Sequence, residues 1–281
     1  MTAQPAPLTT HAEPVMGTVF SFTAVHGDLP ADAVRAALAA ACRVLHHCDA
    51  LFSTWDPASP VSRFRRGEAA LGQMPPEFAE VLRECRAAKE ASGGWFDPWA
   101  MPGGFDPTGL VKGWAIERAL EELRRAGLSG ALINGGGDVA VFGSPAGGHR
   151  WRVGIRHPWR ADALACVIEV GQGPVTEERG LEPAGGSGGS PPRAGIAAVA
   201  TSGPYERGAH LIDPATGRAA SRAASATVTG PGLALADALA TGVAVGGDEA
   251  LPAVAGLDGY AAYLIRPDGS ETDTGGIAFA P

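Results

Sequence analysis

Apolar residues recur along this chain at two spacings, and the two spacings separate predicted helices from predicted strands. A spacing of three to four residues gives a helix one buried face, whereas runs rich in β-branched and aromatic residues suit strands. The first pattern predicts helices over 32–48, 75–92, 108–126 and 235–245, with one more short helix after the last. The second pattern predicts strands over 15–25, 131–133, 151–155, 164–170, 196–201, 226–229 and 261–265.

These elements follow one another without the regular strand–helix–strand alternation of a doubly wound fold. The order therefore predicts an α+β fold with antiparallel-rich sheets, built as one compact unit of two intimately joined lobes. Residues 1–13 are rich in Pro and Thr and are expected to form a flexible tail, so the domain is assigned to 14–281. Within it, the Gly/Pro/Ser-rich segment 182–193 is expected to be a flexible loop.

The charge balance excludes several classes of partner. The chain has 22 basic and 30 acidic residues and a formal net charge of −8. This balance provides no electrostatic footprint for nucleic acid or for an anionic membrane surface. A phosphate compound would instead need a local device, such as a bound metal ion.

Cysteines and apolar runs indicate a cellular compartment. The four cysteines form no CxxC pair and no zinc-type spacing, so buried reduced thiols are expected. No stretch has the pattern of a signal peptide, and no apolar run reaches the roughly 18 residues of a membrane span. These features together predict a cytoplasmic protein without membrane insertion.

Two glycine-containing segments could admit a phosphate or a closely approaching backbone. Lys112 lies between Gly109 and Gly113 near the start of a predicted helix, where free N–H groups and the helix dipole favour an anion. Asp106, just before this helix, is also explained as an ordinary N-cap. The segment 133–138 contains three glycines, which permit close approach of a ligand or form a tight strand turn. No helix follows it, so a Rossmann-type dinucleotide site is excluded.

A histidine and a helical pair of oxygen-bearing side chains come later in the chain. His210 precedes the turn sequence Asp-Pro-Ala-Thr-Gly; imidazole suits proton transfer near neutrality, although a lone histidine is more often structural. Asp237 and Thr241 lie four residues apart in a predicted helix and so share one face. Their hard oxygens suit Mg²⁺ better than zinc. The alternative is a carboxylate placed by the helix dipole beside a solvent-facing threonine.

Taken together and in this order, these segments resemble the ApbE-like family of FAD:protein FMN transferases. The resemblance runs from Val15-Met16-Gly17-Thr18 to about Gly247, and Phe52-Ser53-Thr54-Trp55 is similar to the family's early flavin-contacting segment. Its sharpest parts are Thr201-Ser202-Gly203-x-Tyr205-Glu206-Arg207, His210-x-Ile212-Asp213-Pro214-x-Thr216-Gly217 and Ala236-Asp237-Ala238-Leu239-Ala240-Thr241.

The resemblance implies roles for individual residues and an FAD cleft between the two lobes. His210 stands at the family's histidine near the reacting phosphate. Mg²⁺ is implied at the Gly109 carbonyl and at the side-chain oxygens of Asp237 and Thr241. The residues implied to line or contact FAD are Met16, Trp55, Trp95, Phe96, Asp97, Asp106, Lys112 and Ile212, the last through its backbone region.

The chain departs from the family's pattern in two places. Trp55 stands where tyrosine is usual, a change that keeps ring stacking and loses a phenol hydrogen bond. Only eight residues separate Asp97 from Asp106, where many relatives have a much longer insert.

The implied reaction is Mg²⁺-dependent transfer of FMN from FAD to a Thr or Ser hydroxyl of an acceptor protein, with release of AMP. Two other functions remain open: an FAD pyrophosphatase, in which water is the acceptor, and a flavin-binding protein without turnover. The pair Asp237 and Thr241 weighs against simple flavin binding, because storage needs no Mg²⁺ ligands. Nothing in the sequence separates the transferase from the pyrophosphatase.

Overall fold

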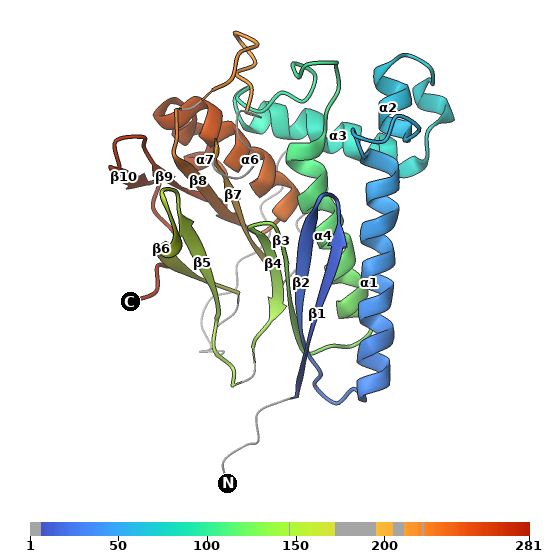
Figure 1. Ribbon diagram of the computed structural model, residues 1–281. Helices are drawn as coiled ribbons and strands as arrows, with labels where there is room; N and C mark the ends of the chain where they lie inside the picture. The colour runs from blue at the N-terminus through green and yellow to red at the C-terminus, as the bar shows by residue number, and fades with distance from the viewer. Residues whose placement is uncertain (1–6, 146, 172–194, 205–210, 221) are drawn as a thin grey trace.

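An eight-stranded antiparallel sheet forms the centre of the protein (Figure 1). The computed structural model describes residues 7–145, 147–171, 195–204, 211–220 and 222–281. Along the sheet the strand order is β1-β2-β3-β4-β7-β8-β9-β10, so strands that follow one another are neighbours except where β5 and β6 leave the sheet. The bounds are β1 Leu8–Val15, β2 Thr18–Val25, β3 Gly130–Gly135, β4 Asp138–Gly143, β7 Ile196–Ser202, β8 Ser225–Gly230, β9 Ala261–Ile265 and β10 Glu271–Asp273.

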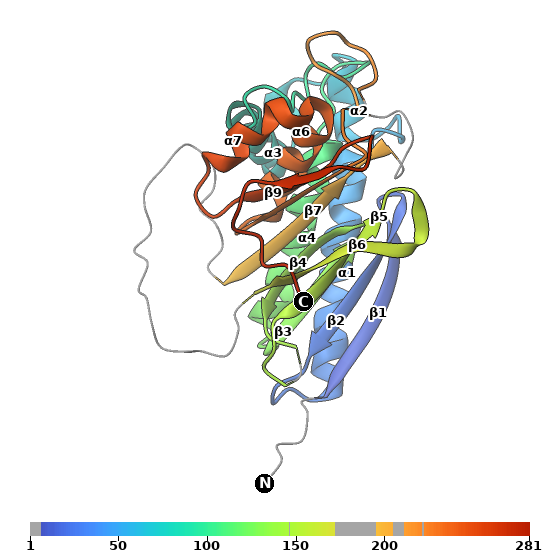
Figure 2. The same cartoon turned by 90° about the vertical axis from the view of Figure 1, so that its left-hand side faces the viewer.

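Helices cover one face of this sheet, and a separate hairpin of β5 and β6 covers part of the other. Figure 2 shows the hairpin in front of the sheet, with α1 and α4 behind it. The hairpin strands are β5 Trp151–His157 and β6 Arg160–Val170. The helices are α1 Ala31–Phe52, α2 Pro60–Arg65, η1 Leu71–Gln73, α3 Pro76–Ala91, α4 Thr108–Arg125, α6 Leu233–Gly246, η2 Gly247–Ala250 and α7 Leu251–Ala255.

Alternation of side chains along the strands produces these layers. On β2, Phe20 and Phe22 point to the helical face and are at most 1% exposed. On β4, Val139 and Val141 point the other way and pack with Trp151 of the hairpin. Because successive side chains of a strand lie on opposite faces, one sheet serves two cores. Burial of each large apolar side chain contributes about 1.5–3 kcal/mol.

The α+β class, the antiparallel sheets and the single compact unit are confirmed. Each long helix appears where its apolar stripe predicts it, and α1 carries Val34, Leu38, Ala41 and Leu45 on its buried face. The division into two lobes with a cleft between them stays a prediction. The loop predicted over 182–193 lies outside the described residues.

The flexible tail predicted for residues 1–13 is wrong from Leu8 onward. Leu8–Val15 is the edge strand β1, paired along its whole length with β2. Its side chains are mostly exposed and include Pro14, so the sequence lacks the apolar alternation by which strands are recognised. An edge strand tolerates both features. The turn between β1 and β2 consists of Met16 and Gly17, both with positive φ, 52° and 71°, as a two-residue hairpin turn requires.

The four cysteines are free thiols, and three of them are buried. Burial raises the pKa of the Cys48 thiol to about 12 and holds that of Cys85 higher than the usual range. Cys166 is only half-buried. Along the described parts of the chain, no helix combines the length and the apolar character needed to cross a membrane.

Candidate functional site

An antiparallel seam between α4 and α6 positions the predicted metal residues. A Cβ built on Gly109 would lie 3.2 Å from Oγ1 of Thr241, and one built on Gly113 would lie 2.6 Å from the carbonyl oxygen of Leu233. One turn along α4 from Gly109, the N–H of Gly113 donates to Oδ2 of Asp237 at 3.2 Å. Each step of four residues along α4 thus matches a step of four residues backward along α6. The glycines allow this approach because no side chain separates the two backbones.

The third step of the seam fixes the start of α6. The Glu117 carboxylate of α4 accepts hydrogen bonds from the backbone N–H groups of Leu233, at short range, and of Ala234, at 3.1 Å. Free N–H groups of a first helical turn need such acceptors, and the positive end of the helix dipole favours a carboxylate. The register of α6 is therefore set at both Glu117 and Gly113.

Hard oxygen atoms meet where the first turns of α4 contact the middle of α6. Asp237 is only 3% exposed although its side chain is charged. Oγ1 of Thr241 lies 3.3 Å from Oγ of Ser202, at the end of β7. Carboxylate, hydroxyl and carbonyl oxygens form the donor set that Mg²⁺ prefers. The chemistry of Gly109, Asp237 and Thr241 fits the predicted ion.

A second buried carboxylate lies close by, on the β3–β4 turn. Gly136 and Gly137 form this turn with φ of +66° and +99°, so the predicted tight strand turn is confirmed. The turn is followed by Asp138, 1% exposed, which forms an ion pair with Lys112 of α4. Oδ1 of Asp138 also accepts the backbone N–H of Thr201 at 3.1 Å. Lys112 is thereby held beside the end of β7.

Met16 and Asp106 lie at the same end of the fold. Thr18, just after Met16, approaches the β3–β4 turn, since a Cβ on Gly136 would lie 3.1 Å from Oγ1 of Thr18. The Met16 N–H points to Oδ2 of Asp49 at 3.4 Å. Oδ1 of Asp106, which precedes the N-cap residue Pro107, accepts the N–H of Thr108 at 3.1 Å. Asp106 thus stands directly before α4, whereas Met16 stands on the β1–β2 turn beside α1.

Trp95, Phe96 and Ile212 join the site through α6 and its neighbours. Phe96 is buried, and its ring lies 3.2 Å from a Cβ built on Gly109. Trp95 packs against the last turn of α6 and lies under the Arg222 guanidinium, 5.2 Å from the ring centroid. The same arginine lies 3.9 Å from Asp213, which directly follows Ile212.

Two predicted cofactor residues are not brought into direct contact with this group. Trp55 is 92% exposed. Asp97 forms an ion pair with Lys89 at 2.6 Å and accepts the N–H of Trp99 at 2.9 Å, so its carboxylate is already held by its own segment. His210 lies outside the described residues.

Sequence reasoning missed several residues that shape the site. Asp138 was visible after three glycines, but its partner Lys112 is far away in the chain. Ser202 stood in a recognised motif, but its contact with Thr241 was not predicted. Glu117 and Asp49 gave no local signal, because each acts on an element distant in sequence.

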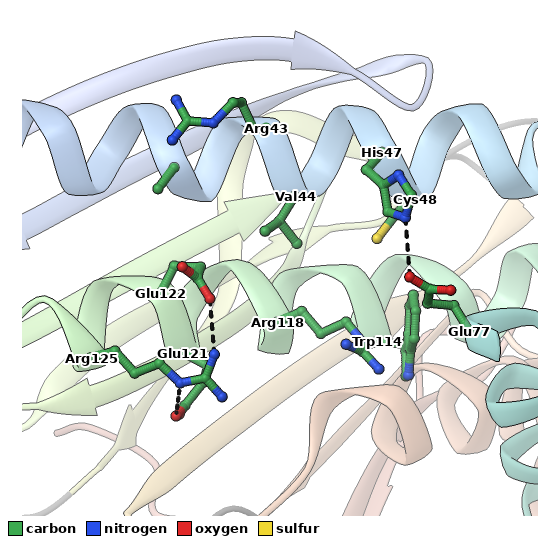
Figure 3. A pocket seen from close by; sticks show the side chains of 11 residues that line it. Arg43, Val44, His47, Cys48, Glu77, Trp114, Arg118, Glu121, Glu122 and Arg125 are labelled. Atoms are coloured by element: carbon green, nitrogen blue, oxygen red, sulfur yellow. Dashed lines mark hydrogen bonds and ion pairs between the residues drawn. The ribbon is translucent and has the colours of Figure 1, made fainter. Parts of the chain in front are cut away.

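A described cavity lies away from these residues. A cavity of about 420 Å³ opens between α1 and α4, with Glu77 of α3 at one end (Figure 3). Several of its charged side chains are paired with one another: His47 with Glu77 at 3.3 Å, and Arg125 with Glu121 at 3.0 Å. None of the predicted site residues lines it.

Known proteins with similar sequences share one name. Proteins named FAD:protein FMN transferase are 34% identical over 59% of this chain in Rhodobacter capsulatus and 32% identical over 53% in Vibrio cholerae. The matches span 29% and 41% of those relatives, so the chain matches less than half of their length.

Solved structures share the fold over almost the whole chain. The flavin transferase ApbE from Vibrio cholerae has a TM-score of 0.74 at 19% identity and covers 98% of each chain. The ApbE protein from Thermotoga maritima has a TM-score of 0.75 at 19% identity, over 95% of this chain and 96% of its own. The sequence model of the ApbE family matches residues 16–103 and 100–264. The chain therefore belongs to the ApbE family.

Proposed function

We propose that this protein is an FAD:protein FMN transferase that moves FMN from FAD onto a Thr or Ser hydroxyl of an acceptor protein. The observation that carries the proposal is the α4–α6 seam, which brings Gly109 of α4 together with Asp237 and Thr241 of α6. Lys112 lies on α4 as well, three residues after Gly109. The names of the relatives support the same activity.

In this reaction the acceptor oxygen forms a bond to the FMN phosphorus while the bond from that phosphorus to the AMP phosphate oxygen breaks. AMP leaves with the electron pair of the broken bond, and the hydroxyl proton passes to a base. Such transfers depend mainly on positioning and on neutralising charge on the phosphate oxygens. Mg²⁺, held by Gly109, Asp237 and Thr241, would supply part of that neutralisation.

The remaining roles fall to side chains around the seam. Lys112 adds a positive charge whose position the buried Asp138 fixes. Trp95 and Phe96 provide aromatic surface beside the last turns of α6, and Trp55 provides an exposed ring on which an isoalloxazine or adenine can stack. Met16 and Asp106 border the same end of the fold.

His210 is the proposed general base, on the resemblance alone. Replacing it with Asn should lower AMP release by about 10²- to 10⁴-fold, the usual cost of losing a positioned acid–base group. FAD affinity and melting temperature should stay unchanged. An unchanged rate of AMP release together with a lower melting temperature would make His210 a structural residue.

The proposal is tested by incubating the protein with FAD, MgCl₂ and candidate acceptor proteins, followed by mass spectrometry of each acceptor. The expected product is an acceptor that carries one FMN in phosphoester linkage. Free FMN and AMP without an adduct would indicate an FAD pyrophosphatase. Intact FAD after incubation with every acceptor would indicate a binding protein.

A further inference from the structure

A cluster of histidine, carboxylate and thiol lies away from the α4–α6 seam, between β1 and α1. Among the described residues, ligand atoms of His11, Glu13 and Cys42 all lie within 4.8 Å of one another. Histidine and glutamate come from the edge strand and the cysteine from the helix that packs beside it (Figure 1). The proposed transferase reaction uses none of these residues.

Strand register explains why the two β1 side chains converge. His11 is paired with Phe22 and Glu13 with Phe20, and both phenylalanines face the helical layer. Residues directly opposite in an antiparallel pair share a face, so His11 and Glu13 also face the helical layer.

Helix periodicity supplies the other side of the cluster. Cys42 and His46 lie four residues apart on α1 and so present their side chains on one face. Pairs at i,i+2 on a strand and at i,i+4 on a helix both place two side chains together.

Glu13 is the centre of this cluster. One carboxylate oxygen, Oε2, lies 3.1 Å from Nε2 of His11, and the other, Oε1, lies 2.7 Å from Nε2 of His46. The carboxylate therefore has one oxygen on the side of His11 and one held by His46. Cys42 is largely buried, whereas His11 and Glu13 retain 40% and 23% side-chain exposure, so an ion can enter from solvent.

Imidazole nitrogen, thiolate sulfur and carboxylate oxygen are together the ligands that Zn²⁺ takes in proteins, whereas Mg²⁺ and Ca²⁺ take oxygen alone. With bond lengths of about 2.0–2.3 Å, ligand atoms around a tetrahedral Zn²⁺ lie about 3–4 Å apart. The observed limit of 4.8 Å needs only small rotations of exposed side chains to reach that spacing.

We propose that His11, Glu13 and Cys42 bind a zinc-class divalent cation that joins the edge strand β1 to α1. His46 acts as a positioning residue, because it holds the second oxygen of Glu13 and leaves the first for the metal. The fourth coordination position faces solvent. Bound metal would fix the strand that leads to Met16, three residues beyond Glu13.

Cobalt(II) is the probe, because it replaces zinc in such sites and gives an intense near-ultraviolet band when a thiolate binds it. Titration of the full chain with Co²⁺ should produce this band, and Zn²⁺ should displace it. The band should be absent in Cys42→Ser and present in Cys166→Ser, which removes the half-buried thiol and so the one most open to solvent. A cobalt spectrum without thiolate character, or an unchanged band in Cys42→Ser, would overturn the proposal.

Zinc affinity gives a second measurement with a matched control. His11→Asn should lower affinity at least about 10²-fold, and His46→Asn about 10- to 100-fold with the thiolate band retained. His47→Asn, the neighbouring exposed histidine paired with Glu77, should leave affinity unchanged. Equal affinities for His11→Asn and His47→Asn would contradict the site.

Thermal stability separates this site from the proposed transferase centre. Zn²⁺ should raise the melting temperature of the natural chain and of Asp237→Asn alike, and should not raise that of His11→Asn. If zinc raises the melting temperature of His11→Asn as much as that of the natural chain, the stabilisation arises at another site and the proposed zinc site is wrong.

Discussion

Two parts of this protein are rich in charged side chains, and they differ in how those charges are held. In the groove between α1 and α4, the Arg125 side chain is 67% exposed and pairs with Glu121 and Glu122 at 3.0 Å each. Beside the α4–α6 seam, Asp138 is 1% exposed and Asp237 is 3% exposed.

The energetic meaning of these two arrangements is different. Glu121 of the groove is 7% exposed, but the arginines that pair with it, Arg124 and Arg125, are exposed. Ion pairs with such solvated partners contribute about 0–1 kcal/mol each. Burial of a carboxylate costs several kcal/mol unless hydrogen bonds and counter-charges offset it. Asp138 and Asp237 lie beside hydroxyl groups that are paired with each other. Burying two carboxylates there is costly if the region serves only to stabilise the fold. Burial combined with hydrogen bonds from backbone N–H groups, rather than charge density, therefore distinguishes the candidate site.

The largest expected effect is on turnover at Asp237. Asp237→Asn keeps a side-chain oxygen that can accept the Gly113 N–H but removes the charge that a metal ion needs. Mg²⁺-dependent AMP release should fall at least about 10²-fold, since even outer-shell partners of a metal cost 10- to 100-fold. FAD affinity, measured by flavin fluorescence, should change little. The control Glu122→Gln, in the groove, should keep full activity, and a fully active Asp237→Asn would remove the contrast.

The next effect concerns stability of the protein without FAD. Lys112→Met leaves the buried Asp138 without its cation, and the free energy of unfolding should fall by about 3 kcal/mol. Denaturant unfolding measures this change. Adding Asp138→Asn should restore part of the loss. Arg125→Ala in the groove should change stability by less than about 0.5 kcal/mol, and equal losses for the two single variants would contradict the comparison.

A smaller loss is expected where the two helices touch. A methyl group at Gly113 would meet the Leu233 carbonyl oxygen at 2.6 Å, so Gly113→Ala must push α6 away from α4. The free energy of unfolding should fall by about 1–3 kcal/mol, and turnover should fall with it because Asp237 moves. Gly72→Ala is the matched control, since a methyl group there meets nothing within 4 Å. A neutral Gly113→Ala would show that the seam is looser than its contacts indicate.

The smallest effect is expected at the exposed ring. Trp55→Ala should raise the dissociation constant for FAD about tenfold, the value of one aromatic stacking contact, with little change in kcat. Trp55→Tyr should bind FAD nearly as well as the natural chain. Trp159→Ala, another exposed tryptophan, serves as the control. If Trp55→Ala and Trp159→Ala bind FAD equally well, Trp55 is outside the flavin site.

Local patterns in the sequence predicted what depends on one element. The stripe of α1 and the i,i+4 pair Asp237 and Thr241 are visible because helix periodicity alone places them. Strand β1 was missed because its exposed edge lacks an apolar alternation, and β4 because Val139 and Phe142 are buried on opposite faces.

Contacts between distant elements could not be predicted in this way. The match of Gly113 with Asp237 and the pairing of Lys112 with Asp138 depend on how α4 packs against α6 and β4. The same holds for His11 and Cys42, because the spacing of the cysteines along the chain does not indicate that Cys42 of α1 lies beside a histidine of β1.

The central claim is that the oxygens beside the α4–α6 seam serve transfer of FMN to a protein. The most direct test follows AMP release and FMN-modified acceptor in one time course. The reaction starts from FAD, Mg²⁺ and the unmodified form of an acceptor that mass spectrometry has shown to become modified. The account predicts equal molar amounts of the two products, and loss of both when Asp237→Asn replaces the natural chain. AMP release that proceeds without modified acceptor, or an adduct that forms equally well with Asp237→Asn, would contradict it.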